Sequence, residues 1–377
     1  MPQPFHICFT FLGNIEFDSR ILKCARTLSS NGYRVSALTL GEKSERRNYL
    51  DIEVMSVGIS SRVSGKARFL LFYVKGLRPT LRARADCYFA SDLYSLPLAY
   101  LAARVSRARL LYDSRELYTS IASLKDRRFT QRFWSFLEKK LIHSADAVFT
   151  VNDALSEYIA ERYRMPKPVT LLNCPPKQVV AKSDRLRRQL SVPSHQKIIL
   201  YQGGLQRGRG IFIALSVIKK IPNAVLVLLG HGGLKGEFSE IVQKENLQQR
   251  VFILDAAPVN ELLTLTASAD VGLCLIENLG KSYYHSLPNK LFEYASAGVP
   301  VVASNFPEIS RFVESNRVGI CVDPENEEEV AAAIQRLITD SKLYASLVDN
   351  CKQTAERYTW ENQEPKLLAV MDRLRKQ

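Results

Sequence analysis

The sequence predicts an α/β protein made of two Rossmann-like, doubly wound domains that face a central cleft. Three observations support this prediction. The chain has 377 residues, more than one hydrophobic core usually sustains. Short apolar runs alternate with longer amphipathic stretches in both halves, as in parallel strands joined by crossover helices. Between the halves, residues 173–195 contain three prolines and a charged stretch, which indicates a connection between domains.

In the first half, each expected strand is short and apolar and precedes a helical pattern. A buried strand is predicted over 6–11, followed by a turn at Gly13 and Asn14 and a helix over 19–30 that ends before Gly32. Later strands are expected at 35–39, 52–57, 87–90, 110–113 and 147–151, and helices near 66–84, 93–106, 127–143 and 153–163.

The second half restarts the alternation with a strand over 198–202 and a glycine-rich turn. Its later strands are expected at 224–229, 251–254, 271–275, 299–303 and 319–322, with helices between them. Residues 358–376 carry apolar side chains at helical spacing. We therefore divide the chain into a first domain, a linker, a second domain and a C-terminal helix, over 1–175, 176–195, 196–356 and 357–377.

Composition is that of a globular protein, with 46% hydrophobic and 24% charged residues. No apolar run approaches the ~18 residues of a membrane-spanning helix. Because residues 1–5 lack the layout of a signal peptide, we expect a cytoplasmic protein. The seven cysteines form no CxxC pair or His/Cys cluster, so we expect reduced thiols and no structural metal.

The positive charge is concentrated in the first half. Residues 1–180 hold 28 Lys and Arg against 16 Asp and Glu, within a net charge of +14 for the whole chain. Solvated helix faces would explain such a pattern, and so would contact with an anionic membrane surface, because phenylalanines and leucines lie among the basic residues. No nucleic-acid-binding motif accompanies the charge, so we expect no nucleic-acid partner. The basic groups are Arg62, Lys66, Arg68, Lys75, Arg78, Arg82, Arg84, Arg104, Arg107, Arg109, Lys125, Arg127, Arg128 and Arg132.

Two glycine-rich turns follow strands of the second half. The first, over 203–210, would let the backbone approach a phosphate while Arg207 and Arg209 neutralise it. The second, over 230–233, contains Gly232 and opens on the same edge of the sheet. A flexible turn with solvated arginines is the alternative interpretation of the first turn.

The segment 286–293 is more specific. Asn289 and Lys290 lie at the start of a predicted helix, and Glu293 follows one turn later. A carboxylate at that position can accept two ribose hydroxyls, while Lys290 and the helix N-terminus face phosphates. An ordinary amphipathic helix would explain the apolar residues but not the combination of Asn, Lys and Glu.

These motifs resemble retaining glycosyltransferases of the GT-B fold, family 4, of the bacterial surface-polysaccharide type, most densely over 198–304. In that family a Glu-x7-Glu motif precedes Ala-x-Gly-x-Pro-Val-Val-Ala, and its second Glu binds the donor ribose. Glu293 and residues 297–303 match this pattern, whereas the first Glu falls on His285. The intervening residues resemble a Leu-Pro-Asn-Lys variant, which implies a donor-binding segment formed by His285, Leu287, Pro288, Asn289, Lys290 and Glu293.

The family's phosphate-binding Arg and Lys map onto Gly204 and Arg209. The resemblance therefore implies that Arg209 stabilises the leaving phosphate, and that Arg207 or Lys290 compensates for the Arg that is absent at Gly204. No Asp-x-Asp pair is present, so we expect a metal-independent enzyme without a cofactor.

In the first half, residues 14–35 resemble the family's Asn-x3-Asp-x-Arg segment, which implies that Gly13 and Asn14 face the donor phosphates. Residues 112–118 resemble its Asp-x-His-Glu segment and place three polar side chains near the acceptor: Asp113, Arg115 and Glu116. Arg115 and Asp92, which ends the preceding strand, are further catalytic candidates. The alternatives are a helix cap for Asp92 and a buried ion-pair turn for 113–116.

The resemblance implies a hexosyltransferase that moves a sugar from a UDP- or GDP-sugar to a glycan or lipid-linked acceptor in polysaccharide biosynthesis. It also implies a C-terminal helix that crosses back to the first domain. The basic first half, with aromatic residues among its charges, favours a lipid-linked acceptor and peripheral contact with the inner face of the cell membrane. Two other functions are compatible with the sequence: a sugar-nucleotide 2-epimerase of the same fold, and a non-catalytic subunit that binds a nucleotide sugar.

Overall fold

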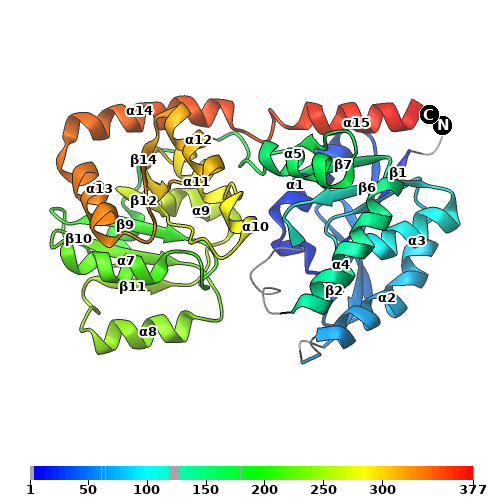
Figure 1. The fold of residues 1–377 in the computed structure, drawn as a ribbon, viewed down its shortest axis with the longest axis horizontal. Helices are drawn as coiled ribbons and strands as arrows, with labels where there is room; N and C mark the ends of the chain where they lie inside the picture. The colour runs from blue at the N-terminus through cyan, green and yellow to red at the C-terminus, as the bar shows by residue number, and fades with distance from the viewer. Residues whose placement is uncertain (1–3, 61, 64, 119–126, 179, 377) are drawn as a thin grey trace. The chain divides into compact units, whose positions relative to one another are not determined.

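The computed structural model describes residues 4–60, 62–63, 65–118, 127–178 and 180–376. The chain divides into two compact units, the first made of residues 1–173 and 363–377 and the second of residues 174–362. Each unit is an α/β layer structure with a mostly parallel central sheet (Figure 1). The predicted fold class is therefore confirmed.

The first unit contains an eight-stranded sheet with the order β3-β4-β2-β1-β5-β6-β7-β8. Among the strands of the described residues, only β3 and β4 pair in antiparallel fashion. Because the strand order changes direction between β1 and β5, the loops that follow these two strands diverge at this edge, the usual position of a ligand site in such sheets. The strands are β1 (His6–Thr10), β2 (Arg34–Gly41), β3 (Glu45–Tyr49), β4 (Ile52–Gly58), β5 (Cys87–Ala90), β6 (Arg109–Ser114), β7 (Ala147–Thr150) and β8 (Val169–Thr170).

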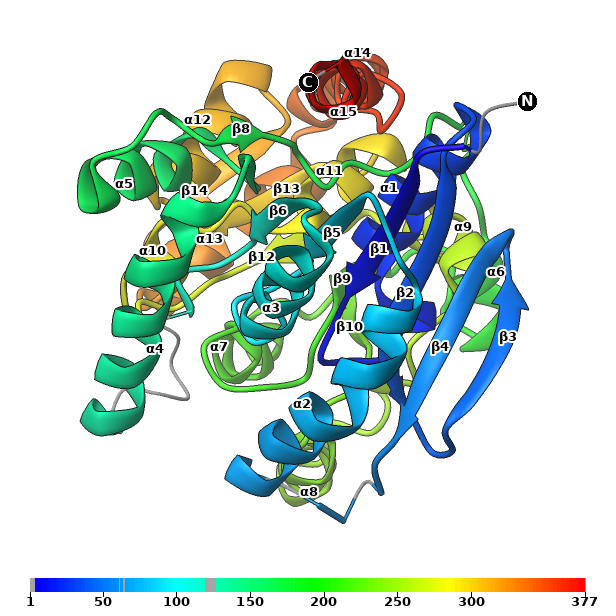
Figure 2. The same cartoon turned by 90° about the vertical axis from the view of Figure 1, so that its right-hand side faces the viewer.

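Helices α2, α3 and α4 cover one face of this sheet, and α1 packs on the other (Figure 2). Helix α15 lies against α1, where Thr27 donates a hydrogen bond to Glu364 at 2.6 Å. The helices of the first unit are α1 (Ser19–Ser30), α2 (Gly65–Arg82), α3 (Leu96–Ser106), α4 (Arg128–Leu141), α5 (Asp153–Tyr163) and α15 (Glu364–Lys376), with short 3-10 turns at Ile15–Phe17 and Ile142–Ser144.

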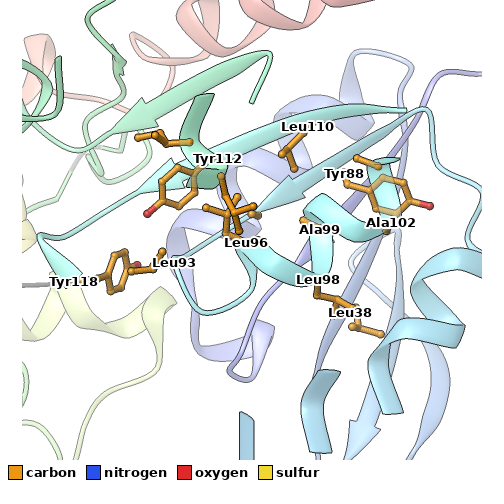
Figure 3. Packing of buried hydrophobic residues seen from close by; sticks show 14 of the residues in the cluster. Leu38, Tyr88, Leu93, Leu96, Leu98, Ala99, Ala102, Leu110, Tyr112 and Tyr118 are labelled. Carbon is orange, nitrogen blue, oxygen red and sulfur yellow. The ribbon is translucent and has the colours of Figure 1, made fainter. Parts of the chain in front are cut away.

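The core of the first unit forms between the sheet and α2, α3 and α4. Alternate residues of a strand point to the same face, so Tyr88 and Leu110 meet Ala99 and Ala102 of α3 (Figure 3). On neighbouring strands, Phe89 stacks on Phe9 with ring centroids 4.8 Å apart. Both faces of the sheet are thus buried, which explains why its central strands read as continuous apolar runs.

The second unit has a six-stranded parallel sheet with the order β11-β10-β9-β12-β13-β14, which reverses between β9 and β12. Its strands are β9 (Lys197–Gln202), β10 (Ala224–Leu229), β11 (Val251–Leu254), β12 (Val271–Cys274), β13 (Val301–Ser304) and β14 (Gly319–Val322). Its helices are α6 (Arg185–Gln189), α7 (Ile211–Val217), α8 (Lys235–Lys244), α9 (Val259–Thr266), α10 (Lys281–Tyr284), α11 (Asn289–Ser296), α12 (Pro307–Asn316), α13 (Glu327–Thr339) and α14 (Ser341–Arg357), with a 3-10 turn at Ile218–Lys220.

Several boundaries differ from the prediction for local reasons. Strand β3 carries charged and polar residues on the sheet edge, and β8 has only two residues, so neither produces an apolar run. Strand β13 begins after Pro300, which has no N–H to donate to a ladder. Helix α3 begins at Leu96 instead of near 93, because Asp92 and Ser95 form the turn that precedes it.

The segment predicted as a linker, 176–195, belongs to the second unit. Leu186 is fully buried, and Arg187 pairs with Asp270 at 3.4 Å. The C-terminal helix begins at Glu364 and not at 357, since residues 358–363 form a turn in which the Trp360 N–H donates to the Pro175 carbonyl at 2.8 Å.

None of the helices in the described part of the chain has the length and apolarity needed to cross a membrane. Of the basic residues singled out in the first half, Lys125 lies outside the described residues.

Candidate functional site

The segment 286–293 leads into α11, as the sequence predicts. Pro288 precedes the helix, Asn289 is its first residue, and Glu293 lies half-buried one turn later. Gln202, the last residue of β9, donates a hydrogen bond from its side-chain amide to Glu293 at 2.5 Å. The side-chain oxygen Oε1 of Gln202 accepts a hydrogen bond from the Thr266 hydroxyl at 2.7 Å. These bonds fix the Glu293 carboxylate at the carboxyl end of β9.

Lys290 is buried without a hydrogen-bond partner. Its side chain is packed so that the residue is only 8% exposed, and within the described residues its Nζ has no acceptor. The Nζ atom lies 3.7 Å from the centroid of the Tyr201 ring. Burial lowers the pKa of Lys290 to about 7; nearby Cys274 and Glu293 oppose this shift and Arg209 adds to it. A buried amine of this kind is costly unless an anion binds beside it.

The turn after β9 passes over Lys290. A Cβ atom added at Gly203 would lie 3.5 Å from the lysine Nζ, and Gly203 has a φ of +127°, a conformation that favours glycine. The Tyr201 hydroxyl donates to the Gly204 carbonyl at 2.6 Å and holds the turn in place. Arg209, half-buried, lies with its guanidinium 5.1 Å from the centroid of the Tyr283 ring. The structure thus brings the glycine turn, two cations and the Glu293 carboxylate together.

Arg207 points away from this group. Its guanidinium is exposed, pairs with Glu237 of α8 at 3.4 Å and lies over the Phe212 ring at 5.5 Å. Of the two arginines in the turn, Arg209 is therefore the one that accompanies Lys290.

Gly232 has a packing role that the sequence did not reveal. A Cβ atom at this position would lie 2.2 Å from the Leu205 carbonyl oxygen, so the second glycine turn fits only as glycine against the first. His285 is the residue after α10, and its ring lies edge-on to that of Tyr284 with the centroids 5.2 Å apart. Leu287 and Pro288 are half-buried in the approach to α11.

Two contributors to this group were missed by sequence reasoning: Tyr201, under the lysine, and Gln202, bonded to Glu293. The only available signal was their position at the end of an apolar strand that precedes a glycine turn, since the carboxyl ends of parallel strands commonly carry binding residues.

In the first unit, a buried ion-pair network occupies the carboxyl end of β6. Asp113 binds the Arg20 guanidinium through both oxygens, at 2.7 and 2.8 Å. Arg115 donates to the same carboxylate at 2.9 Å and to Asp18 at 2.5 Å. Burial alone would raise the pKa of Asp113, but Arg20 and Arg115 outweigh burial and hold it below its usual range. Asp113 thus belongs to a buried ion-pair turn, the alternative that the sequence left open. Glu116 is exposed and does not belong to the buried part of this turn.

Asp92 is buried at the carboxyl end of β5. Burial raises its pKa to about 6, and the hydrogen bonds from Ser95 oppose that shift. Its Oδ1 accepts the Ser95 N–H at 2.6 Å, at the entrance to α3. This oxygen is therefore bound within the turn that precedes α3, whose N-cap is Ser95 and not Asp92. A pKa near 6 is a property common among catalytic carboxyls.

Gly13 and Asn14 lie in the loop after β1. The Gly13 carbonyl accepts the Leu40 N–H at 2.8 Å, and Asn14 Oδ1 accepts the Glu16 N–H at 3.0 Å. The Gly13 carbonyl is thus bound to β2, and the Asn14 side chain is bound within the loop. The described residues contain no group of three His, Cys, Asp or Glu side chains that could hold a metal ion.

The fold is that of the GT-B glycosyltransferases. Sucrose-phosphate synthase from Thermosynechococcus elongatus superposes with a TM-score of 0.82 at 17% identity, covering 98% of this chain and 99% of that one. Anabaena Alr3699/HepE, solved in complex with UDP-glucose, gives a TM-score of 0.74 at 16% identity, covering 97% and 99%.

The family follows from the sequence matches. The model for glycosyl transferases group 1 matches residues 182–354, and that for the glycosyl transferase 4-like domain matches residues 18–175. This chain belongs to the group 1 glycosyltransferases. The D-inositol 3-phosphate glycosyltransferase of Corynebacterium urealyticum is 24% identical over 62% of this chain and 58% of its own length. The chain spans about half the length of the curated relatives it matches.

Proposed function

We propose that this protein is a metal-independent, retaining hexosyltransferase that uses a UDP- or GDP-sugar. Its acceptor is a glycan or a lipid-linked glycan in surface-polysaccharide biosynthesis. The observation that carries the proposal is the buried Lys290 amine, which has no hydrogen-bond acceptor among the described residues and lies beside Arg209 and Glu293 under a glycine turn. The UDP-glucose complex of Alr3699/HepE and the glycosyltransferase names of the relatives support a nucleotide-sugar donor.

In this proposal the donor diphosphate binds over the glycine turn, where Lys290 and Arg209 neutralise it. Glu293 accepts hydrogen bonds from the ribose hydroxyls, and Gln202 holds that carboxylate in position. The interactions with the phosphate strengthen as the sugar leaves, because negative charge then grows on the departing oxygen. Two side-chain cations supply this stabilisation without a metal ion.

The reaction breaks the bond between the anomeric carbon and the phosphate oxygen and forms one to the acceptor oxygen on the same face of the sugar. The acceptor's proton passes to the departing phosphate oxygen, so no side-chain base is required. We assign Asp92 and Arg115 to the acceptor side. Arg115 is held by Asp113 and Asp18, which fixes the direction of its remaining donors.

Glu293→Ala is expected to weaken donor binding by about 10- to 100-fold, because two hydrogen bonds to a charged acceptor are lost. Isothermal titration calorimetry with UDP-, GDP- and CMP-sugars first identifies the donor and then measures this effect. Glu240→Ala, at an exposed carboxylate of α8, is the control. Unchanged affinity in Glu293→Ala would remove Glu293 from the site.

Turnover separates this proposal from its two rivals. Incubation with the bound donor alone yields no epimerised sugar if the protein is a transferase, whereas a 2-epimerase converts the donor without an acceptor. Release of the nucleoside diphosphate on addition of extracted glycan or lipid-linked acceptor excludes a non-catalytic subunit.

Donor affinity is expected to be constant below pH 7 and to weaken above it, because Lys290, with its pKa of about 7, then binds the diphosphate only after taking up a proton. The loss is at most about tenfold per pH unit. Two neighbouring groups do not titrate between pH 6 and 9, because burial raises the pKa of Cys274 to about 11 and raises that of Tyr201 as well. The diphosphate diester of a nucleotide sugar is already fully ionised at these pH values, so it does not contribute to the pH dependence.

Calorimetry at pH 6 to 9, in buffers of different ionisation enthalpy, measures both the affinity and the proton uptake. A pH-independent affinity with no proton uptake at pH 8 would show that Lys290 does not meet the donor phosphates.

We also propose that the protein is cytoplasmic and makes peripheral contact with the inner face of the cell membrane. The basic first half of the chain supports this part, because a lipid-linked acceptor lies at a membrane surface.

A further inference from the structure

Exposed apolar side chains gather on three adjacent helices of the first unit. Seven of the ten large hydrophobic residues that are exposed in the described chain lie on α2, α3 and α4. Helix α3 lies between the other two on the same face of the sheet (Figure 2). The exposed fraction is 88% for Phe129 and 68% for Val105. A soluble protein rarely exposes so many large apolar side chains on one face. The seven residues are Leu70, Val74, Leu101, Val105, Phe129, Phe133 and Phe136.

The same helices carry positive charge almost without acidic residues. Their sequences contain ten Lys and Arg residues and one carboxylate, Glu138. Glu138 is buried and accepts hydrogen bonds from Tyr112 and Tyr163 at 2.8 and 2.6 Å, so it does not neutralise the surface. Within the described residues, no ion pair joins any of the ten cations to a carboxylate. They are Lys66, Arg68, Lys75, Arg78, Arg82, Arg104, Arg128, Arg132, Lys139 and Lys140.

Helix α2 also has a shallow hollow of about 390 Å³ that combines both properties. Its apolar lining comes from Val74, Leu77 and Leu81, and three arginines surround it: Arg78, Arg82 and Arg84. A surface with alkyl side chains beside guanidinium groups suits a phosphate that carries a hydrocarbon chain. Duplex nucleic acid would leave seven large apolar side chains in water, so it fits this surface less well.

We propose that the exposed side chains of α2, α3 and α4 form a docking face for an anionic phospholipid membrane. The inference rests on the proposed lipid-linked acceptor and assigns the membrane contact to particular residues. Basic side chains bind the lipid phosphates, and the phenylalanines and leucines enter the boundary between headgroups and acyl chains. Helices α2 and α4 follow strands that end at the carboxyl edge of the sheet, so this face begins at the edge that holds Asp92 and Arg115.

The test is flotation with vesicles of phosphatidylcholine alone and of phosphatidylcholine containing about one third phosphatidylglycerol. The protein is expected to bind the anionic vesicles at least about tenfold more tightly and to be released by about 0.5 M salt. Two variants of the docking face should each lose this binding about tenfold or more: the serine triple variant at Phe129, Phe133 and Phe136, and the pair Arg128→Glu with Arg132→Glu.

The matched control reverses two exposed charges on α15 of the same unit, Arg373→Glu with Lys376→Glu, and should keep vesicle binding. If the triple variant does not fold, Phe129→Ser alone serves, because that ring is 88% exposed. In a Trp360→Phe background, brominated lipid should quench Trp134, whose ring lies 5.3 Å from that of Phe133.

Equal loss of binding in the α15 control would overturn the docking face, and so would vesicle binding that survives both face variants. Preferential binding of duplex DNA that the serine variant retains would also overturn it. Donor affinity, measured in the same variants by calorimetry, should stay unchanged. A failure of the membrane proposal is thereby distinguished from a failure of the proposed transferase, in which the unaltered protein would bind no nucleotide sugar.

Discussion

Lys290→Met is expected to abolish most donor binding while raising the thermal stability of the free protein. Methionine matches the aliphatic length of lysine and removes a buried amine that has no acceptor among the described residues. Leaving such a group unsatisfied costs about 1–3 kcal/mol, so its removal should raise the Tm by a few degrees. Loss of a charge-assisted contact to the diphosphate should raise the donor Kd about 10- to 100-fold.

The gain in stability should depend on pH. The pKa of Lys290 is lowered by burial from 10.5 to about 7 in the folded chain, so the unfolded chain binds more protons between these values. Stability of the unaltered protein therefore rises with pH across that window, and the advantage of Lys290→Met is largest below pH 7. Calorimetric melting and donor titration together measure both effects, with Lys244→Met on the exposed face of α8 as control. A variant that melts earlier and still binds donor would make Lys290 a structural residue.

Arg20→Ala is expected to destabilise the first unit by about 3–5 kcal/mol, because removal of one partner leaves the buried Asp113 charge poorly compensated. Both side chains of this pair are 3% exposed, and the Arg20 guanidinium also donates to the Leu171 carbonyl at 2.5 Å. The loss therefore loosens α1 from the strand ends at the carboxyl edge. Urea unfolding followed by circular dichroism gives the change in unfolding free energy.

Arg34→Ala is the matched control. Arg34 pairs with Glu53, and the two side chains are 54% and 31% exposed, so this ion pair should contribute less than about 1 kcal/mol to the unfolding free energy. Since the folded pKa of Asp113 is depressed, the contribution of the buried pair is present above the ordinary aspartate pKa of about 4 and disappears as pH falls below it. Similar losses in the two alanine variants, or a loss in Arg20→Ala that persists in acid, would contradict this account of the network.

The candidate site was partly predictable because its residues are close in sequence. Asn289, Lys290 and Glu293 fall within one helical turn, and their spacing alone predicted that Lys290 and Glu293 share a region of α11. The turn containing Arg209 was found from its glycines. The different surroundings of Arg207 and Arg209 could not be found that way, since Glu237 and Phe212 attract the former and Tyr283 lies beside the latter.

The first unit shows the limit of local reasoning. Asp18 and Arg20 belong to a recognised segment, but their partners Asp113 and Arg115 lie more than 90 residues away in the chain. No periodicity or propensity links residues at that separation. The pairing arises because β1 and β6, on either side of β5, have their carboxyl ends at the same edge of the sheet.

The sequence by itself determined the two α/β units, most of their strands and helices, and the family, because these depend on periodic apolar patterns and on short contiguous motifs. Tertiary structure decided which charges are satisfied and which are not. It paired Asp113 with Arg20, assigned the linker residues to the second unit and left the Lys290 amine buried without an acceptor in the part of the chain that the structure describes. Burial and the choice of partner depend on strands that are distant in the chain, so only the folded arrangement sets the electrostatics from which the function is proposed.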